Sequence, residues 1–231
     1  MTFSIQERII NRLLLKAIPL LDIGLLHGKM GVSILFYNNS RYMANPLYGK
    51  FADELLDQIM QKMHKGLSID FEYGLAGIAW GFEYLIHNNF VIGESNDICE
   101  EIDKKIMQID LRRIDDLSLE TGLEGLLHYI LIHMQRSIVK KTDLPFDSTY
   151  LKDLYNVACS ISPTKINDNM NILIKSYKNF YEGKEPIHYS ANLSGFIENL
   201  EVNDTNLLKL PLGLRNGLAG FLLKNIETPE L

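Results

Sequence analysis

The chain alternates between amphipathic segments and almost wholly apolar ones. In the amphipathic segment 48–63, apolar residues recur at helical spacing, and Leu55, Ile59 and Met63 share one face. Residues 95–109 repeat this pattern, with charged side chains on the polar face. Apolar segments follow at 32–37, 74–86 and 122–134, as expected for helices buried on most sides. No run alternates with the period of a strand, so the pattern predicts an all-α protein.

Helix boundaries are clearest near the N-terminus. Ser4 and Glu7 have the spacing of a capping box, which predicts a helix starting there and ending near Pro19. The later chain is less regular. Further helices are predicted over residues 149–161, 162–181, 190–200 and 213–225.

Each apolar segment begins in a motif of leucine and repeated glycine. The copies are GLLHGKMG at 24–31, GLAGIAWG at 74–81, GLEG at 122–125 and GLRNGLAG at 213–220. The spacing places these glycines on one face of a helix. A glycine inside a helix costs about 1 kcal/mol relative to alanine, so its repeated use indicates a face that another backbone approaches closely.

The spacing of the motifs predicts a repeat. The first three copies begin 50 and 48 residues apart, and the last begins 91 residues later, close to two such steps. A repeat of this length indicates helical hairpins, each with an amphipathic outer helix and an apolar inner helix. The prediction is one all-helical domain over residues 1–231, containing four or five hairpins.

These motifs resemble those of the lanthionine synthetase C-like family, which comprises the lanthipeptide cyclases and their relatives. The resemblance rests on the four glycine–leucine motifs and extends over nearly the whole chain. It implies an α/α toroid. A complete family toroid has about seven hairpins, so this chain would be a shortened, incomplete array. An open arc exposes the inner helices at its ends, which predicts a smaller closed ring, a homodimer or a covering partner protein.

The zinc ligands of the family's cyclases are not matched. Those enzymes hold zinc with two cysteines and a histidine, in motifs resembling Trp-Cys-Tyr-Gly and Cys-His-Gly. Here Cys99 lies in an acidic outer helix and Cys159 has no adjacent histidine. The sequence therefore predicts no metal, no cofactor and no thioether cyclisation, with the two cysteines as buried, reduced thiols.

Three residues are candidates for catalysis. His27 lies in a GLLHG segment that resembles the family segment carrying a histidine implicated in acid–base chemistry. Asp70 and Glu72 precede the second motif and could act as a base or bind a cationic group. The alternatives are a loop-stabilising hydrogen bond for His27 and favourable helix-dipole interactions for the acids.

Four further residues are candidates for ligand binding. Asp22 and Glu120, like Glu72, stand two residues before a glycine motif, so a toroid would gather them around the mouth of a central cavity. Such a ring could bind a cation, a basic peptide or a sugar, and repeated helix capping is the alternative. Tyr73 and Trp80 could stack on a ligand in the cavity or pack in the core.

Charge and hydropathy exclude some classes of binding partner and indicate where the protein is located. The net charge is −6 and no dense Lys/Arg block occurs, so nucleic acid is not expected. No apolar run is long enough for a membrane span, and no secretory signal is apparent. These features predict a cytoplasmic protein.

The expected function is binding of a peptide or small molecule in the central cavity. A zinc-free family member would act in modification or maturation of a ribosomally made peptide, and whether it is an enzyme stays open. One alternative is a carbohydrate-active enzyme using a pair of carboxylates from Asp22, Asp70, Glu72 and Glu120. The other is a non-catalytic scaffold subunit.

Overall fold

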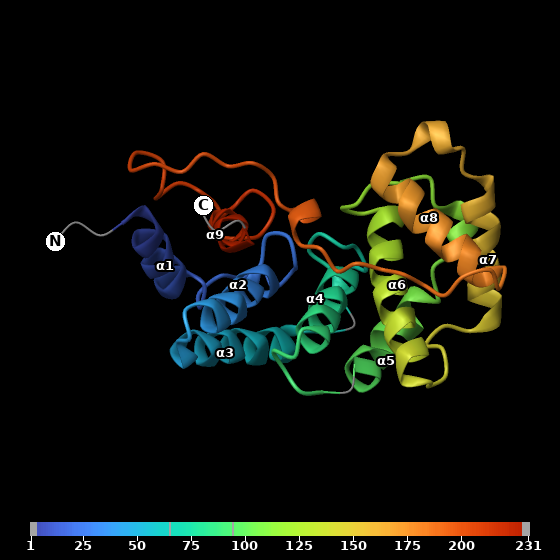
Figure 1. Ribbon diagram of the computed structural model, residues 1–231, viewed down its shortest axis with the longest axis horizontal. Helices are drawn as coiled ribbons and strands as arrows, with labels where there is room; N and C mark the ends of the chain where they lie inside the picture. Colours follow the sequence, from blue (N-terminus) through green and yellow to red (C-terminus); the bar gives the residue numbers. More distant parts are fainter. Residues whose placement is uncertain (1–3, 65, 94, 228–231) are drawn as a thin grey trace. The chain divides into compact units, whose positions relative to one another are not determined.

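The computed structural model describes residues 4–64, 66–93 and 95–227 (Figure 1). Over these residues it is all-helical and contains no strand, which confirms the predicted all-α class. The α-helices are α1 Ile5–Lys16, α2 Lys29–Tyr42, α3 Pro46–Lys62, α4 Leu75–His87, α5 Ser95–Ile106, α6 Leu123–Lys140, α7 Ser148–Ser160, α8 Asp168–Tyr181 and α9 Leu218–Glu227. The short 3₁₀ helices are η1 Leu111–Arg113, η2 Pro163–Lys165 and η3 Ser194–Phe196.

The helices form two compact units. Unit 1 comprises Met1–Ser68, Glu72–Gly74 and Asn192–Leu231, and unit 2 comprises Ile69–Phe71 and Leu75–Ala191. The toroid, the single domain and the covering partner stay predictions.

Unit 1 is built around α2. This helix packs against α3 on one side and α9 on another, and α1 also contacts α9 (Figure 1). Most of α2 is buried, as its apolar sequence predicts. The predicted capping box of α1 is confirmed, because the Glu7 N–H donates to Ser4 Oγ and the Ser4 N–H donates to the Glu7 carboxylate.

Unit 2 is built around α4 and α6. These two helices pack on each other, while α5 covers α4 and α8 covers α6. All residues of α4 from Leu75 to Ile86 are buried. The amphipathic helices α7 and α8 pair with each other and bury only one face each. Apolar inner and amphipathic outer helices are therefore present in this unit.

The prediction that the motif glycines all lie inside helices is wrong. Gly24 and Gly28 lie in a loop before α2, and only Gly31 lies within the helix. The loop before α2 folds back over the first turn, because a Cβ on Gly31 would clash with the Leu25 carbonyl oxygen. The loop before α9 also comes close, with Leu214 Cβ 2.8 Å from that Cβ. The predicted close approach therefore exists, but it is a loop against a helix start rather than one helix against another.

The same loop precedes several helices. An amide in the first turn donates to a carbonyl seven residues earlier, from Lys29 to Asp22 at 3.0 Å and from Leu123 to Asp116 at 3.0 Å. The pair Leu218 and Pro211 repeats the bond at 3.0 Å before α9. Helix starts leave amides without intrahelical partners, and the folded-back loop satisfies one of them. The motif therefore caps the helix through backbone hydrogen bonds.

Two later helices differ from the expectation. The segment predicted as one helix over 162–181 divides into η2 and α8, because Asn167 caps α8 by accepting from the Met170 N–H. The helix predicted over 190–200 is limited to η3, a single 3₁₀ turn. Cys99 is buried as predicted, but Cys159 is exposed, so the prediction of two buried thiols is wrong for Cys159.

None of the helices that the structure describes is long and apolar enough to cross a membrane.

Candidate functional site

His27 and Glu72 are joined directly in unit 1. Nε2 of His27 lies 2.8 Å from Oε1 of Glu72, although the residues are 45 positions apart. Each side chain is 20% exposed, so the pair is accessible to a ligand while partly shielded from water. The two residues come from the loops before α2 and α4. The structure therefore brings together two of the three predicted catalytic candidates.

Tyr73 completes an exposed surface around this pair. Its ring stacks on the His27 imidazole, with centroids 5.2 Å apart and planes 28° apart. The tyrosine is 49% exposed, so an aromatic face lies beside the imidazole and the carboxylate. We call His27, Glu72 and Tyr73 the His27 site.

The backbone holds the His27 site in place. The Leu26 N–H donates to the Glu72 carbonyl at 3.2 Å, and the Leu26 carbonyl accepts from the Leu214 N–H at 2.7 Å. A Cβ on Gly24 would lie 2.6 Å from Tyr73 Cα, and one on Gly213 would lie 2.7 Å from the His27 carbonyl. Because only glycine permits these approaches, the motif glycines fix the loops that carry the site.

Asp22 shapes the first of these loops. Its Oδ1 accepts from the Gly24 N–H at 2.7 Å. Its counterpart before α6 is Asp116, which accepts in the same way from the Ser118 N–H at 2.8 Å. Glu120 stands three residues before the first residue of α6, whereas Asp22 stands seven before that of α2, and the Glu120 carbonyl accepts from the Phe71 N–H at 2.9 Å. Asp22 and Glu120 were predicted to occupy equivalent positions, and the structure shows that they do not.

Sequence reasoning missed Asp116. A signal was present, because Asp22 and Asp116 both stand seven residues before the first residue of a helix. Asp70 is half-buried in unit 2, and its participation in a site with His27 stays a prediction. The ring of acids around a cavity mouth stays a prediction as well.

Trp80 lies in the core of unit 2. Its side chain is fully buried and its Nε1–H donates to the Tyr189 hydroxyl at 2.7 Å. The indole also stacks on Tyr84, with centroids 5.5 Å apart. This position supports the packing alternative rather than ligand stacking.

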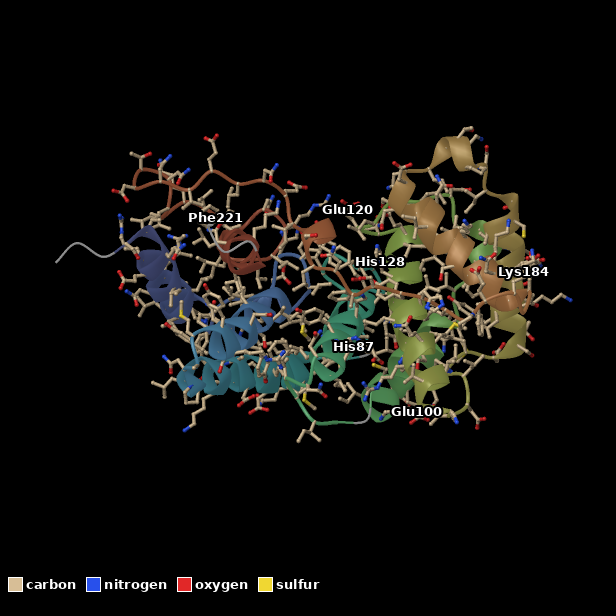
Figure 2. The ribbon with its side chains drawn as sticks, in the orientation of Figure 1. His87, Glu100, Glu120, His128, Lys184 and Phe221 are labelled. Atoms are coloured by element: carbon tan, nitrogen blue, oxygen red, sulfur yellow. The ribbon has the colours of Figure 1, made fainter. Side chains whose placement is uncertain are left out.

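The Tyr189 hydroxyl extends this core into a polar network. It lies 2.7 Å from Nδ1 of His128, on the N-terminal half of α6 (Figure 2). Burial lowers the pKa of His128 to about 3, so the ring is neutral. Asn169 donates to Nε2 at 3.0 Å, which leaves the proton on Nδ1, where it is donated to Tyr189. His128 is therefore a buried hydrogen-bonding residue.

A second buried network joins α4, α5 and α6. His133 Nδ1 lies 2.5 Å from Glu83 Oε1, and its Nε2 lies 3.0 Å from Asp103 Oδ2. The Tyr129 hydroxyl donates to Asp103 at 2.6 Å. Burial disfavours the charged form of His133, but hydrogen bonds and charge interactions with Asp103 and Glu83 outweigh it and raise the pKa to about 9.

No group of three or more His, Cys, Asp or Glu side chains arranged to hold a metal occurs among the described residues. Burial raises the pKa of Cys99 well above its usual value, which keeps this thiol protonated and unreactive.

No family model matches the chain, and no curated protein is significantly similar to it. The resemblance to the lanthionine synthetase C-like family therefore stays a prediction.

Proposed function

We propose that this chain is a zinc-free relative of the lanthionine synthetase C-like proteins that binds a peptide at the His27 site. It would act in the cytoplasm during maturation of a ribosomally made peptide, without thioether chemistry. The observation that carries the proposal is the His27–Glu72 pair, partly exposed beside the exposed Tyr73.

The chemistry of the pair suits a peptide. A carboxylate can only accept hydrogen bonds, so Nε2 of His27 carries a proton toward Glu72, and Nδ1 is the ring nitrogen that a ligand can bind. A peptide N–H or hydroxyl can donate to Nδ1. Tyr73 offers apolar area and little conformational entropy to lose, as tyrosines in binding surfaces commonly do.

The loops that carry these groups are fixed before any ligand arrives. The hydrogen bonds at Leu26 and the close approaches at Gly24 and Gly213 reduce the entropy that binding would otherwise cost. The proposal concerns recognition and includes no catalytic step.

The contacts at the candidate acids do not favour a carbohydrate-active enzyme. Glu72 faces an imidazole and Asp22 accepts from an amide of its own loop. A glycosidase needs two carboxylates facing one bond.

Peptide display against the immobilised protein tests the proposal. Selected peptides are expected to share a consensus and to bind the wild type and Glu201→Gln equally, because Glu201 is exposed and lies outside the site. Loss of the charged hydrogen bond in Glu72→Gln should weaken binding about tenfold. Tyr73→Ser, at an exposed position, gives a second variant that leaves the core intact.

Two outcomes would overturn the proposal. One is a display that enriches no peptide above a mock surface, and the other is enriched peptides that bind Glu72→Gln and Tyr73→Ser as tightly as the wild type. Stoichiometric zinc in the purified protein, measured by elemental analysis, would contradict the zinc-free assignment.

A further inference from the structure

The Glu72 carboxylate of the His27 site has one oxygen that no protein group uses. Its Oε1 lies 2.8 Å from Nε2 of His27, and this is its one hydrogen bond or ion pair among the described residues. Oε2 has no partner there and is not a buried atom. The side chain is 20% exposed, so Oε2 is open to a donor from a ligand.

Tyr73 places an aromatic face beside this carboxylate. Its ring stacks on the His27 imidazole, with centroids 5.2 Å apart, and 49% of the residue is still exposed. Guanidinium and ammonium groups are attracted to the faces of aromatic rings, and the planar guanidinium also stacks on them. A carboxylate next to an exposed tyrosine is therefore a surface that suits a cation.

The charges around the site do not oppose a cation. No Lys or Arg side chain forms an ion pair with Glu72 in the part of the chain that the structure describes. Arg215 contacts the loop of His27 through its backbone N–H, which donates to the Leu26 carbonyl at 2.9 Å. Its side chain is paired elsewhere, since Nε donates to Oε1 of Glu198 at 2.7 Å. The net charge of −6 attracts cationic partners over a longer range.

Other kinds of side chain suit the site less well. An apolar side chain would cover Oε2 of Glu72 without giving it a donor, which costs the carboxylate its hydration. An anionic one would be repelled by the same charge. A neutral amide could donate to Oε2, but hydrogen bonds between two ionised groups are roughly twice as strong.

We propose that the peptide bound at the His27 site is basic and is anchored there by an arginine. This inference rests on the proposed function and names the class of its ligand. The guanidinium donates to Oε2 of Glu72 and stacks on the exposed ring of Tyr73. Arginine is preferred to lysine because its planar group donates and stacks at the same time, whereas an ammonium is a compact, strongly hydrated charge.

NMR titration with acetyl-Gly-Arg-Gly-amide tests the requirement for charge. The matched peptide contains citrulline, which keeps the length and most of the N–H donors of arginine but is uncharged. The arginine peptide should shift the signals of His27 and Tyr73 to saturation. The citrulline peptide should bind about tenfold more weakly. The lysine peptide should bind more weakly than the arginine peptide and more tightly than the citrulline peptide.

Variants identify the carboxylate and the ring. Glu72→Gln keeps the shape of the side chain and should bind the arginine and citrulline peptides alike. Glu201→Gln removes an exposed charge outside the site and should keep the preference for arginine. Tyr73→Phe retains the ring and should bind the arginine peptide as the wild type does, whereas Tyr73→Ser should bind it several-fold more weakly. Comparing two peptides on one variant removes any general effect of the substitution on folding.

The inference is overturned if the arginine peptide gives no saturable shifts, if the citrulline peptide binds as tightly, or if Glu72→Gln keeps the preference for arginine. Peptides from the display that need Glu72 and Tyr73 but share no basic residue would also overturn it, and they would leave peptide binding at the His27 site intact. A display that enriches no peptide would overturn both proposals.

Discussion

Glu83 on α4 and His133 on α6 face each other in the core of unit 2, with 2.5 Å between Glu83 Oε1 and His133 Nδ1. Oδ2 of Asp103 lies 3.0 Å from Nε2, the other imidazole nitrogen of His133. The three side chains are almost fully buried, so their charges are compensated within the protein rather than by water. This arrangement makes the stability of the unit depend on pH.

We expect the free energy of unfolding to fall as the pH rises from neutral to alkaline. The pKa of His133 is about 9 in the folded chain and about 6.5 when unfolded, so its contribution is complete below pH 6.5 and is lost as the pH passes 9. The loss should be on the order of 3 kcal/mol. Urea unfolding curves at pH 6, 7, 8 and 9.5 measure it.

His133→Gln provides the control for this pH dependence. The variant should be less stable at pH 7, because the buried Asp103 and Glu83 carboxylates lose the imidazolium between them, and only Arg136, 3.9 Å from Glu83 Oε2, stays near this pair. Its unfolding free energy should also lose most of the alkaline slope. A wild-type stability that is constant or rises between pH 7 and 9 would contradict the charged imidazole.

The sequence predicts local structure well where a local signal decides it. Ser4 and Glu7 predict the start of α1 because a capping box acts within one turn. The apolar run before His87 predicts a buried α4 because burial follows composition. The glycine spacing was misleading, because glycines at helical offsets also fit a loop folded over a helix start.

The candidate site depends on contacts that no local pattern contains. His27 and Glu72 were each predicted, but their hydrogen bond joins loops 45 residues apart. The buried pair of Glu83 and His133 escaped prediction because each is a single polar residue in an apolar helix, and only the packing of α4 on α6 brings them together.

Gly31 should not tolerate even a methyl group. A Cβ there would lie 2.8 Å from Leu214 Cβ and closer still to the Leu25 carbonyl oxygen, a backbone atom that cannot move alone. We expect Gly31→Ala to lower the free energy of unfolding by about 1–3 kcal/mol, the usual cost of overpacking. Gly195→Ala, with nothing within 4 Å of the added Cβ, is the matched control. Equal stability of the two variants in denaturant titrations would show that the close approach is absent.

The His27–Glu72 pair should contribute little to stability. Both side chains are partly exposed, and polar pairs near the surface typically contribute about 0.2–1 kcal/mol. A double-mutant cycle with His27→Asn and Glu72→Gln should therefore give a coupling energy below about 1 kcal/mol. A coupling of several kcal/mol would mean that the pair is a structural element, which would weaken its use as a recognition surface.

Tyr189→Phe should destabilise unit 2 specifically. Removal of the hydroxyl takes away the acceptor that Tyr189 offers to the buried N–H groups of Trp80 and His128, at a cost of about 1–3 kcal/mol. Trp80 is the single tryptophan of the chain and is fully buried, so its fluorescence reports unfolding of this unit. Tyr155→Phe removes a hydroxyl bonded to Glu182 at the surface and should shift the denaturation midpoint far less. If the two variants unfold at the same denaturant concentration, the Tyr189 hydroxyl does not hold the core network together.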